Sequence, residues 1–176
     1  MNYIIIDLEA TCWKNVMDFT KMEIIEIGAV KLAGDSLDVL GELPCFVRPV
    51  DSPELSEFCK ELTSITQQDV DAAETFDIVF PKLLAWIGEE DYKIVSWGNY
   101  DMKQFVIDCQ RHDLEMPEKF EQEHINLKKE FAKLKHRRPC GMKQALRMLD
   151  LPLEGTHHRG IDDARNIAKI AQIVFR

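Results

Sequence analysis

Short apolar runs and amphipathic segments alternate along the chain, and their periods predict which segments are strands and which are helices. Residues 2–7 form an apolar, β-branched run that ends in an acid, as expected for a central strand buried on both faces. Residues 22–33 and 37–48 are expected to form two more strands, separated by a turn at Gly34 and Asp35. The chain therefore opens with three strands in succession.

Strands and helices alternate in the remainder of the chain. A fourth strand is predicted over residues 93–97 and a short fifth strand near 123–126. Short helical pieces are expected over 54–72, and Thr75 is a plausible N-cap for an amphipathic helix over 75–88. Further helices are predicted over 100–112, 127–135, 141–150 and 160–175. This order predicts an α/β fold, with a mixed five-stranded sheet flanked by helices, in a single domain over residues 1–176.

The amino-acid composition and the net charge limit the classes of protein to which the chain can belong. Hydrophobic residues make up 45% of the chain and charged residues 30%, which is ordinary for a globular fold. The net charge of −9 argues against a simple electrostatic nucleic-acid binder, because such proteins usually carry a surplus of bases. It does not exclude a nucleic-acid enzyme whose carboxylates hold metal ions.

Targeting and redox signals are weak. The apolar runs are too short to span a membrane, and the N-terminus MNYIIIDLEA lacks the features of a signal peptide. A cytoplasmic location is therefore expected. The five cysteines are odd in number and widely spaced, with no CxxC pair, so a disulfide framework or a structural zinc site is not expected.

Two acids, Asp7 and Glu9, stand at the end of the first predicted strand. Residues two apart on a strand point to the same face, so their carboxylates lie side by side. Paired carboxylates near a core repel unless a cation neutralises them, and hard oxygen ligands suit Mg²⁺ or Mn²⁺. The alternative is a solvated strand end, since a lone DxE is common by chance.

Asp101 follows the fourth predicted strand, at the strand-to-helix junction where ligands bind in open α/β sheets. An Asp at a helix start is also a common cap, so this position alone does not decide between the two roles.

The last predicted helix carries an acid on its apolar face. On a helical wheel Asp163 falls within the apolar arc, whereas Asp162 falls on the polar side. A buried acid is uncommon without a partner or a metal, so Asp163 is a candidate site residue. His158 precedes it in the loop entering the helix and can accept a proton near neutral pH, although its neighbour His157 leaves the choice of histidine open.

Together these segments resemble the three motifs of the DEDDh 3′→5′ exonucleases, the DnaQ-like branch of the ribonuclease H-like fold. The segments are residues 7–11 (DLEAT), 97–101 (WGNYD) and 158–166 (HRGIDDARN). The His-x4-Asp spacing of the third motif selects His158 with Asp163. Residues 23–30 (EIIEIGAV) and 58–67 (FCKELTSITQ) look like the Eri-1-like branch, which includes the 3′ histone-mRNA exonucleases and the bacterial KapD group. The resemblance covers essentially the whole chain.

The resemblance implies a two-metal mechanism. Asp7, Glu9 and Asp163 would hold the first Mg²⁺, and Asp7, with Asp101 through water, would help to place the second; Mn²⁺ is expected to substitute. Two such ions stabilise the attacking and leaving oxygens of a phosphoryl displacement. His158 would be the general base that deprotonates the attacking water, and Glu9 would help to orient that water. The expected product is a nucleoside 5′-monophosphate released from the 3′ end.

The resemblance also implies contacts to the terminal nucleotides. The backbone around Ala10 and Thr11 would hold the last nucleotide. Apolar residues can contact the faces and sugar edges of a single strand. The residues implied for this, in addition to His158, are Leu62, Thr63 and Ile65. Without the resemblance, Leu62 and Ile65 would be interpreted as core residues, as Phe58 and Trp97 are here.

Basic residues are concentrated in residues 128–147, which contain eight lysines and arginines and a single acid, Glu130. This is either a solvated helix or a patch that steers a phosphate backbone into the site, and we favour the second. The tip, residues 135–139, is the part expected to touch substrate.

Three functions remain in competition. The first is a 3′→5′ exonuclease that prefers single-stranded RNA or short RNA overhangs, and the second is a DnaQ-like exonuclease acting on DNA. The third is a catalytically silent RNA-binding module, against which the five intact catalytic positions argue. Only the closer likeness to the Eri-1-like branch favours RNA. The chain begins directly at the first strand, so no accessory nucleic-acid-binding domain is expected.

Overall fold

A computed structural model describes residues 1–16 and 18–176 and contains one mixed five-stranded sheet. The strands stand in the order β3-β2-β1-β4-β5. β2 pairs antiparallel with both β1 and β3, whereas β1, β4 and β5 run parallel to one another. Their bounds are β1 Asn2–Ala10, β2 Ile24–Leu32, β3 Val39–Phe46, β4 Tyr92–Ser96 and β5 Ile125–Asn126. The mixed five-stranded sheet predicted from the sequence is confirmed.

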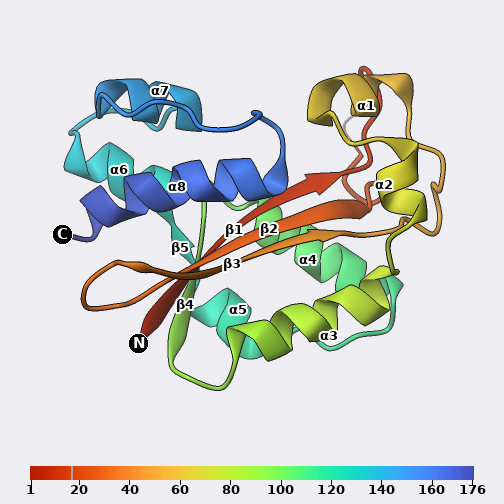
Figure 1. The fold of residues 1–176 in the computed structure, drawn as a ribbon, viewed down its shortest axis with the longest axis horizontal. Coiled ribbons are helices and arrows are strands. Elements are labelled where there is room, and N and C mark those ends of the chain that lie inside the picture. The colour runs from red at the N-terminus through yellow and green to blue at the C-terminus, as the bar shows by residue number, and fades with distance from the viewer. Residues whose placement is uncertain (17) are drawn as a thin grey trace.

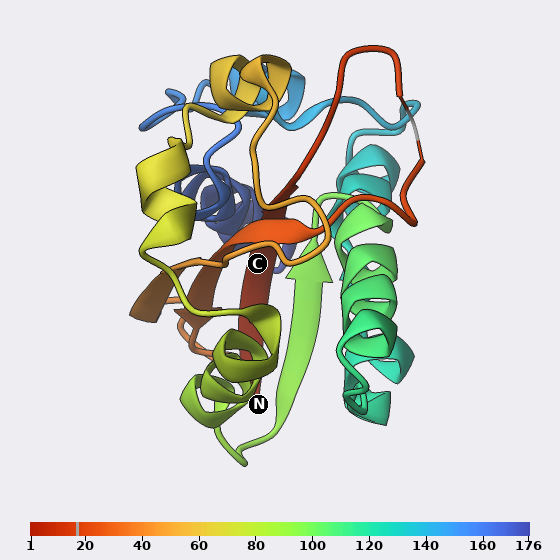
Figure 2. The same cartoon turned by 90° about the vertical axis from the view of Figure 1, so that its right-hand side faces the viewer.

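Helices cover both faces of this sheet (Figures 1 and 2). α3, α4 and α5 lie on one face, whereas α6, α7 and α8 lie on the other. α1 and α2 lie beyond the end of β1, between β3 and α3 in the chain. Their bounds are α1 Glu57–Thr63, α2 Gln67–Asp71, α3 Phe76–Ile87, α4 Tyr100–Arg111, α5 Glu118–Gln122, α6 Leu127–Leu134, α7 Met142–Met148 and α8 Gly160–Val174. The predicted helices are all present, but the five-residue α5 was missed, because so short a segment shows no clear period.

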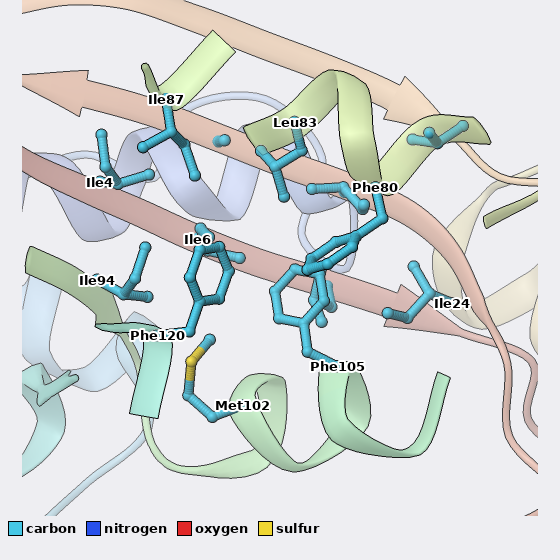
Figure 3. Close-up of a cluster of buried hydrophobic side chains, with 14 of the residues drawn as sticks. Ile4, Ile6, Ile24, Phe80, Leu83, Ile87, Ile94, Met102, Phe105 and Phe120 are labelled. Carbon is cyan, nitrogen blue, oxygen red and sulfur yellow. The ribbon is translucent and has the colours of Figure 1, made fainter. Parts of the chain in front are cut away.

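The apolar run of β1 is explained by burial on both faces. Ile4 and Ile6 pack with Phe80 and Phe105 in the core beneath α3 and α4, as Figure 3 shows. Ile5 points the other way, into the core beneath α6, α7 and α8. All three isoleucines are 0% exposed, as expected for a central strand covered by helices on both sides. The same alternation directs the odd-numbered residues of β1, Asp7 and Glu9 among them, toward the face that α8 covers.

Caps hold the short helices near the end of β1. Ser56 caps α1 by accepting a hydrogen bond from the Cys59 amide at 3.0 Å, and its hydroxyl donates to the Cys12 carbonyl at 2.6 Å. α2 begins with a reciprocal capping box between Thr66 and Asp69. Thr75 occupies the predicted N-cap position of α3, but its side chain makes no capping hydrogen bond.

Within the described residues, no helix is long and apolar enough to cross a membrane. The five cysteines are all free thiols, as the sequence predicted. Three of them, Cys59, Cys109 and Cys140, are buried, and Cys12 and Cys45 are partly exposed.

Candidate active site

Four carboxylates from three separate segments meet at one end of the sheet. Asp7 and Glu9 lie on β1, Asp101 lies in the first turn of α4 just after β4, and Asp163 lies in the first turn of α8. β1 and β4 are parallel neighbours, so their carboxyl ends reach the same edge. Figure 1 shows the N-terminal end of α8 beside this end of β1. The topology therefore gathers the acids that the sequence singled out.

The acids are close enough to share a cation. Oxygen atoms of Asp7, Glu9 and Asp163 all lie within 4.8 Å of one another. Glu9, Asp101 and Asp163 are each no more than 9% exposed, and Asp7 is half-buried. Asp101 is held in place by the Leu8 amide, which donates to its Oδ1 at 3.1 Å. Asp163 is buried, as the helical wheel predicted.

Packing these carboxylates together costs free energy while they are charged. Burial raises the pKa of Asp7 well above its usual value, and the charges of Asp101, Glu9 and Asp163 raise it further. Burial, followed by the charges of Asp163 and Glu26, raises the pKa of Glu9 to about 9. The pKa of Asp101 is raised to about 6, mainly by burial. Carboxylates arranged in this way are suited to a divalent cation, which would offset the repulsion between them.

His158 of the third motif and its neighbour His157 both reach Asp163. His157 Nδ1 lies 2.9 Å from Asp163 Oδ2 and 3.0 Å from Oδ1, whereas the His158 amide donates to Oδ2 at 3.1 Å. Their ring centroids are 3.9 Å apart, and both side chains line the same pocket. Burial lowers the pKa of His158, so its imidazole is neutral and able to accept a proton near pH 7. His157 is therefore a second site histidine, although the motif spacing selected only His158.

A buried glutamate that the sequence analysis did not single out anchors this histidine loop. Glu26 on β2 is 1% exposed, and its Oε2 accepts from the Gly160 amide at 2.9 Å and from Arg159 Nε at 3.1 Å. The guanidinium of Arg159 also stacks over the ring of Phe46, 5.1 Å from its centroid. Glu26 thus fixes the residues directly after His158. The signal available in the sequence was an acid in the middle of an apolar strand, IIEIGAV.

Two glycines allow α8 to approach the sheet closely. A Cβ built on Gly28 would lie 2.0 Å from the Gly160 carbonyl carbon. A Cβ on Gly160 would lie 3.1 Å from the Asp7 carbonyl oxygen. The first turn of α8, which carries Asp163, therefore lies directly on β1 and β2 only because these positions lack side chains.

A pocket of about 390 Å³ opens beside the acids. It contains Asp7, Glu9, Asp101, Asp163, His157 and His158, and it is completed by Leu8, Ala10, Cys12, Met22, Leu62, Trp97, Tyr100, Gly141, Met142 and Ile167. The lining therefore combines acidic and apolar side chains. Trp97, expected in the core, is partly exposed to this pocket, and its Nε1 donates to the Cys140 carbonyl. Met22, Tyr100 and Met142 were missed as lining residues, because tertiary packing brings them to the pocket from separate segments.

The predicted nucleotide contacts divide into two groups. Leu62 is 37% exposed and lines the pocket, as Ala10 does. Thr63 and Ile65 are 0% exposed, and the Thr63 hydroxyl donates to the Cys59 carbonyl, so the expected contact of these two side chains with a strand does not fit their burial.

The structure also bears on two neighbouring predictions. The side chain of Thr11 is buried, and its hydroxyl accepts from the Glu23 amide. The predicted role concerns the Thr11 backbone, whose N–H donates to the Glu23 carbonyl at 2.8 Å. Phe58, expected in the core, is 36% exposed beside Leu62, because both lie on the outer face of the short helix α1.

Comparison with known proteins identifies the family. The model of the exonuclease family RNase_T matches residues 4–171. The chain belongs to the exonuclease family. Its ribonuclease H-like fold and its DEDDh motifs agree with that assignment, which confirms the resemblance inferred from the sequence.

Curated relatives from this exonuclease family match almost the whole chain. The chain is 37% identical to the 3′-5′ exoribonuclease 1 of Rattus norvegicus, over 95% of this chain and 51% of the relative. It is 33% identical to the ERI1 exoribonuclease 2 of Xenopus laevis, over 96% of this chain and 27% of the relative. The chain therefore spans about half or less of the length of these relatives.

Solved exonucleases have the same fold. One similar structure, described as the 3′-end specific recognition of histone mRNA stem-loop by 3′-exonuclease, has a TM-score of 0.93 and 32% identity, covering 99% of this chain and 63% of that one. The nuclease domain of 3′hExo, a DEDDh family member bound to rAMP, has a TM-score of 0.88 and 33% identity, covering 98% of this chain and 90% of that one.

Proposed function

We propose that residues 1–176 form one nuclease domain, a metal-dependent 3′→5′ exonuclease that removes nucleoside 5′-monophosphates from single-stranded nucleic acid and prefers RNA. One observation carries the proposal. Asp7, Glu9, Asp101 and Asp163 line one pocket together with two histidines, in a chain whose exonuclease-family match spans residues 4–171. Four acids and a base at one strand end are the groups that this hydrolysis requires.

The donor set fits a pair of divalent ions, which we propose to be Mg²⁺ with Mn²⁺ as a substitute. Asp7, Glu9 and Asp163 would hold the first ion, because their oxygens lie within 4.8 Å of one another. Asp7 and Asp101 would help to hold the second. All of these ligands are carboxylate oxygens, which Mg²⁺ prefers. When bound, such ions stabilise charge on the attacking and leaving oxygens of the phosphodiester.

The side chains of the chain itself supply proton transfer and orientation. His158 would accept the proton of the attacking water, for which a neutral imidazole is required, and its lowered pKa supplies one near pH 7. Glu9 would orient that water. His157, bonded to Asp163, would fix the carboxylate that His158 approaches through its own backbone amide.

The terminal nucleotide would lie against the apolar residues of the pocket. Leu62 and Ala10 line the pocket. Leu62 would contact the last nucleobases, and the backbone around Ala10 and Thr11 would hold the terminal nucleotide. Apolar walls suit a single strand, because every unpaired base offers a flat face.

The preference for RNA is supported by the relatives. Those named above are exoribonucleases, and a similar nuclease domain was solved with rAMP bound. Neighbours described with DNA, such as Exonuclease X with duplex DNA, are only 21% identical or less and show the fold alone. A catalytically silent RNA-binding module is not favoured, because all five motif positions are intact. We also propose, on the sequence alone, that the protein acts in the cytoplasm.

The test uses 5′-labelled single-stranded RNA and DNA of matched sequence with Mg²⁺, Mn²⁺ or EDTA. The proposal predicts a ladder that shortens from the 3′ end, release of nucleoside 5′-monophosphates, faster shortening of RNA, and no reaction in EDTA. Internal cuts, or cleavage that persists in EDTA, would refute the mechanism. Equal rates on both strands would refute only the preference for RNA.

A further inference from the structure

A dense group of exposed bases lies on α6, on α7 and on the loop that joins them. We call it the basic rim. It consists of Lys129, Lys133, Lys135, Arg137, Arg138, Lys143 and Arg147, all of which are exposed. The stretch contains one acid, Glu130. The whole chain has a net charge of −9, yet this one segment has a surplus of basic residues. Solubility alone does not explain so local a surplus.

Most charges of the basic rim have no ion-pair partner among the described residues. Among the ion pairs of the described residues, only Lys133 of this group takes part, with Glu130. Arg137 instead contacts the Met148 sulfur. Bases elsewhere in the chain are commonly paired with an acid: Lys21, Lys60, Lys82, Arg111, Lys119, Arg159, Arg165 and Lys169. The basic rim therefore keeps its charge available for an anionic partner.

The basic rim is continuous with the pocket. Gly141 and Met142, which follow its loop and begin α7, line the pocket beside His158. The next residue, Lys143, is exposed in the first turn of α7. A shallow groove lined by Lys129, Lys133, His136 and Arg137 extends the surface along α6.

The opposite side of the pocket has the other character. There α1 contributes the exposed apolar residues Phe58 and Leu62, together with Glu61, and its single lysine, Lys60, pairs with Glu57. Figure 1 shows α7 and α1 on the two sides of the N-terminal end of α8. This difference in character suits nucleobases of the substrate on the α1 side and its phosphates on the α7 side.

We infer that the basic rim binds the phosphate backbone of the substrate strand upstream of the nucleotide in the pocket. The inference rests on the proposed exonuclease function and adds where the rest of the strand lies. The partner is a single-stranded polynucleotide, bound through its phosphates without regard to sequence. Lys135 and Arg138 are the sharpest probes, because among the described residues neither forms an ion pair or a side-chain hydrogen bond.

The size of the effect follows from counterion release. Each phosphate contact on a single strand contributes a slope of about 0.7 to log affinity against log salt, which corresponds to about fourfold in affinity at about 0.15 M salt. Removing two contacts is therefore expected to lower kcat/KM about tenfold at that salt, and to make the salt slope shallower by about 1.4.

The test compares K135Q/R138Q with K82Q/K103Q. The control removes the same charge from exposed residues of α3 and α4, on the other face of the sheet. The substrates are an RNA trinucleotide and an RNA of about 20 nucleotides, which is longer than the site of most single-strand-binding folds.

We expect K135Q/R138Q to lose about tenfold in kcat/KM, through KM, on the long strand only. The trinucleotide should be cleaved as in the wild type, and the control should keep wild-type rates on both substrates. The inference is overturned if the two variants have the same kcat/KM on the long strand. It is also overturned if the kcat/KM of K135Q/R138Q falls equally on the trinucleotide. If the wild type cleaves neither substrate, the proposed function itself fails.

Discussion

Glu26 lies outside the four clustered acids and anchors the loop that carries His158. It accepts hydrogen bonds from the Gly160 amide and from Arg159, and so fixes the chain on the C-terminal side of His158. The change to test is Glu26→Ala, which leaves the Arg159 charge and the buried Gly160 N–H without their partner.

The magnitude follows from the burial of the pair. Removing one partner of a buried ion pair costs about 3–5 kcal/mol. Arg159 is 25% exposed, and water will recover part of its loss, so we take the lower end, about 3 kcal/mol. For a domain of this size that corresponds to a fall in Tm of about 6–12 °C. The loosened loop should also lower kcat by about tenfold to a hundredfold, because a displacement of about 1 Å is enough to do so.

Glu42→Ala is the matched control. Glu42 lies on β3, the strand next to β2, and pairs at 2.6 Å with Arg165 of α8. Both side chains of this pair are at least a third exposed. An exposed pair contributes about 0–1 kcal/mol, so this variant should unfold within about 2–4 °C of the wild type and keep its kcat. Thermal unfolding with Mg²⁺ present, together with kcat on single-stranded RNA, measures both effects. If Glu26→Ala is no more destabilised than Glu42→Ala and equally active, the reasoning about burial is refuted.

Three further predictions concern the same loop and acids. His158→Ala should lower kcat about a hundredfold and His157→Ala much less; the reverse order in single-turnover rates would assign the general base to His157. Asp162→Ala should keep turnover but unfold about 1 kcal/mol more easily in a denaturant titration, because Asp162 accepts from the Thr156 amide at 2.8 Å; complete loss of turnover would show that it is a ligand. In EDTA, Tm should fall as the pH rises from about 5 to 9. The folded pKa of Glu9 is about 9, above its usual 4.5, so its stabilising contribution is full below that usual value and is lost as the pH approaches 9. A Tm that rises over this range would contradict the repulsion between the acids.

The sequence predicted the sheet and the acids because both leave periodic signals. A strand buried on both faces must be apolar throughout, which identified β1, and an acid on the apolar arc of a helix identified Asp163. The His-x4-Asp spacing of the third motif selected His158 with Asp163, but it did not show that the adjacent His157 also reaches Asp163 in space.

What was missed depends on contacts between distant segments. Glu26 and Arg159 are far apart in the chain, and nothing local to either residue shows that they meet. Thr63 and Ile65 were expected to touch substrate through the resemblance, but the turn at Ser64, with φ 59°, directs both into the core beneath α1. Asp162 was expected on the surface, but it is half-buried because it holds the loop before His157.

If the carboxylates of Asp7, Glu9, Asp101 and Asp163 form a divalent-metal site, the protein should bind Mn²⁺. Bound Mn²⁺ can be counted by electron paramagnetic resonance, with adenosine 5′-monophosphate present, in the wild type and in Asp163→Asn. We expect two ions per chain in the wild type and at least one fewer in Asp163→Asn, at unchanged secondary structure by circular dichroism. Binding that is absent from the wild type, or identical in the two proteins, would contradict the proposed metal site.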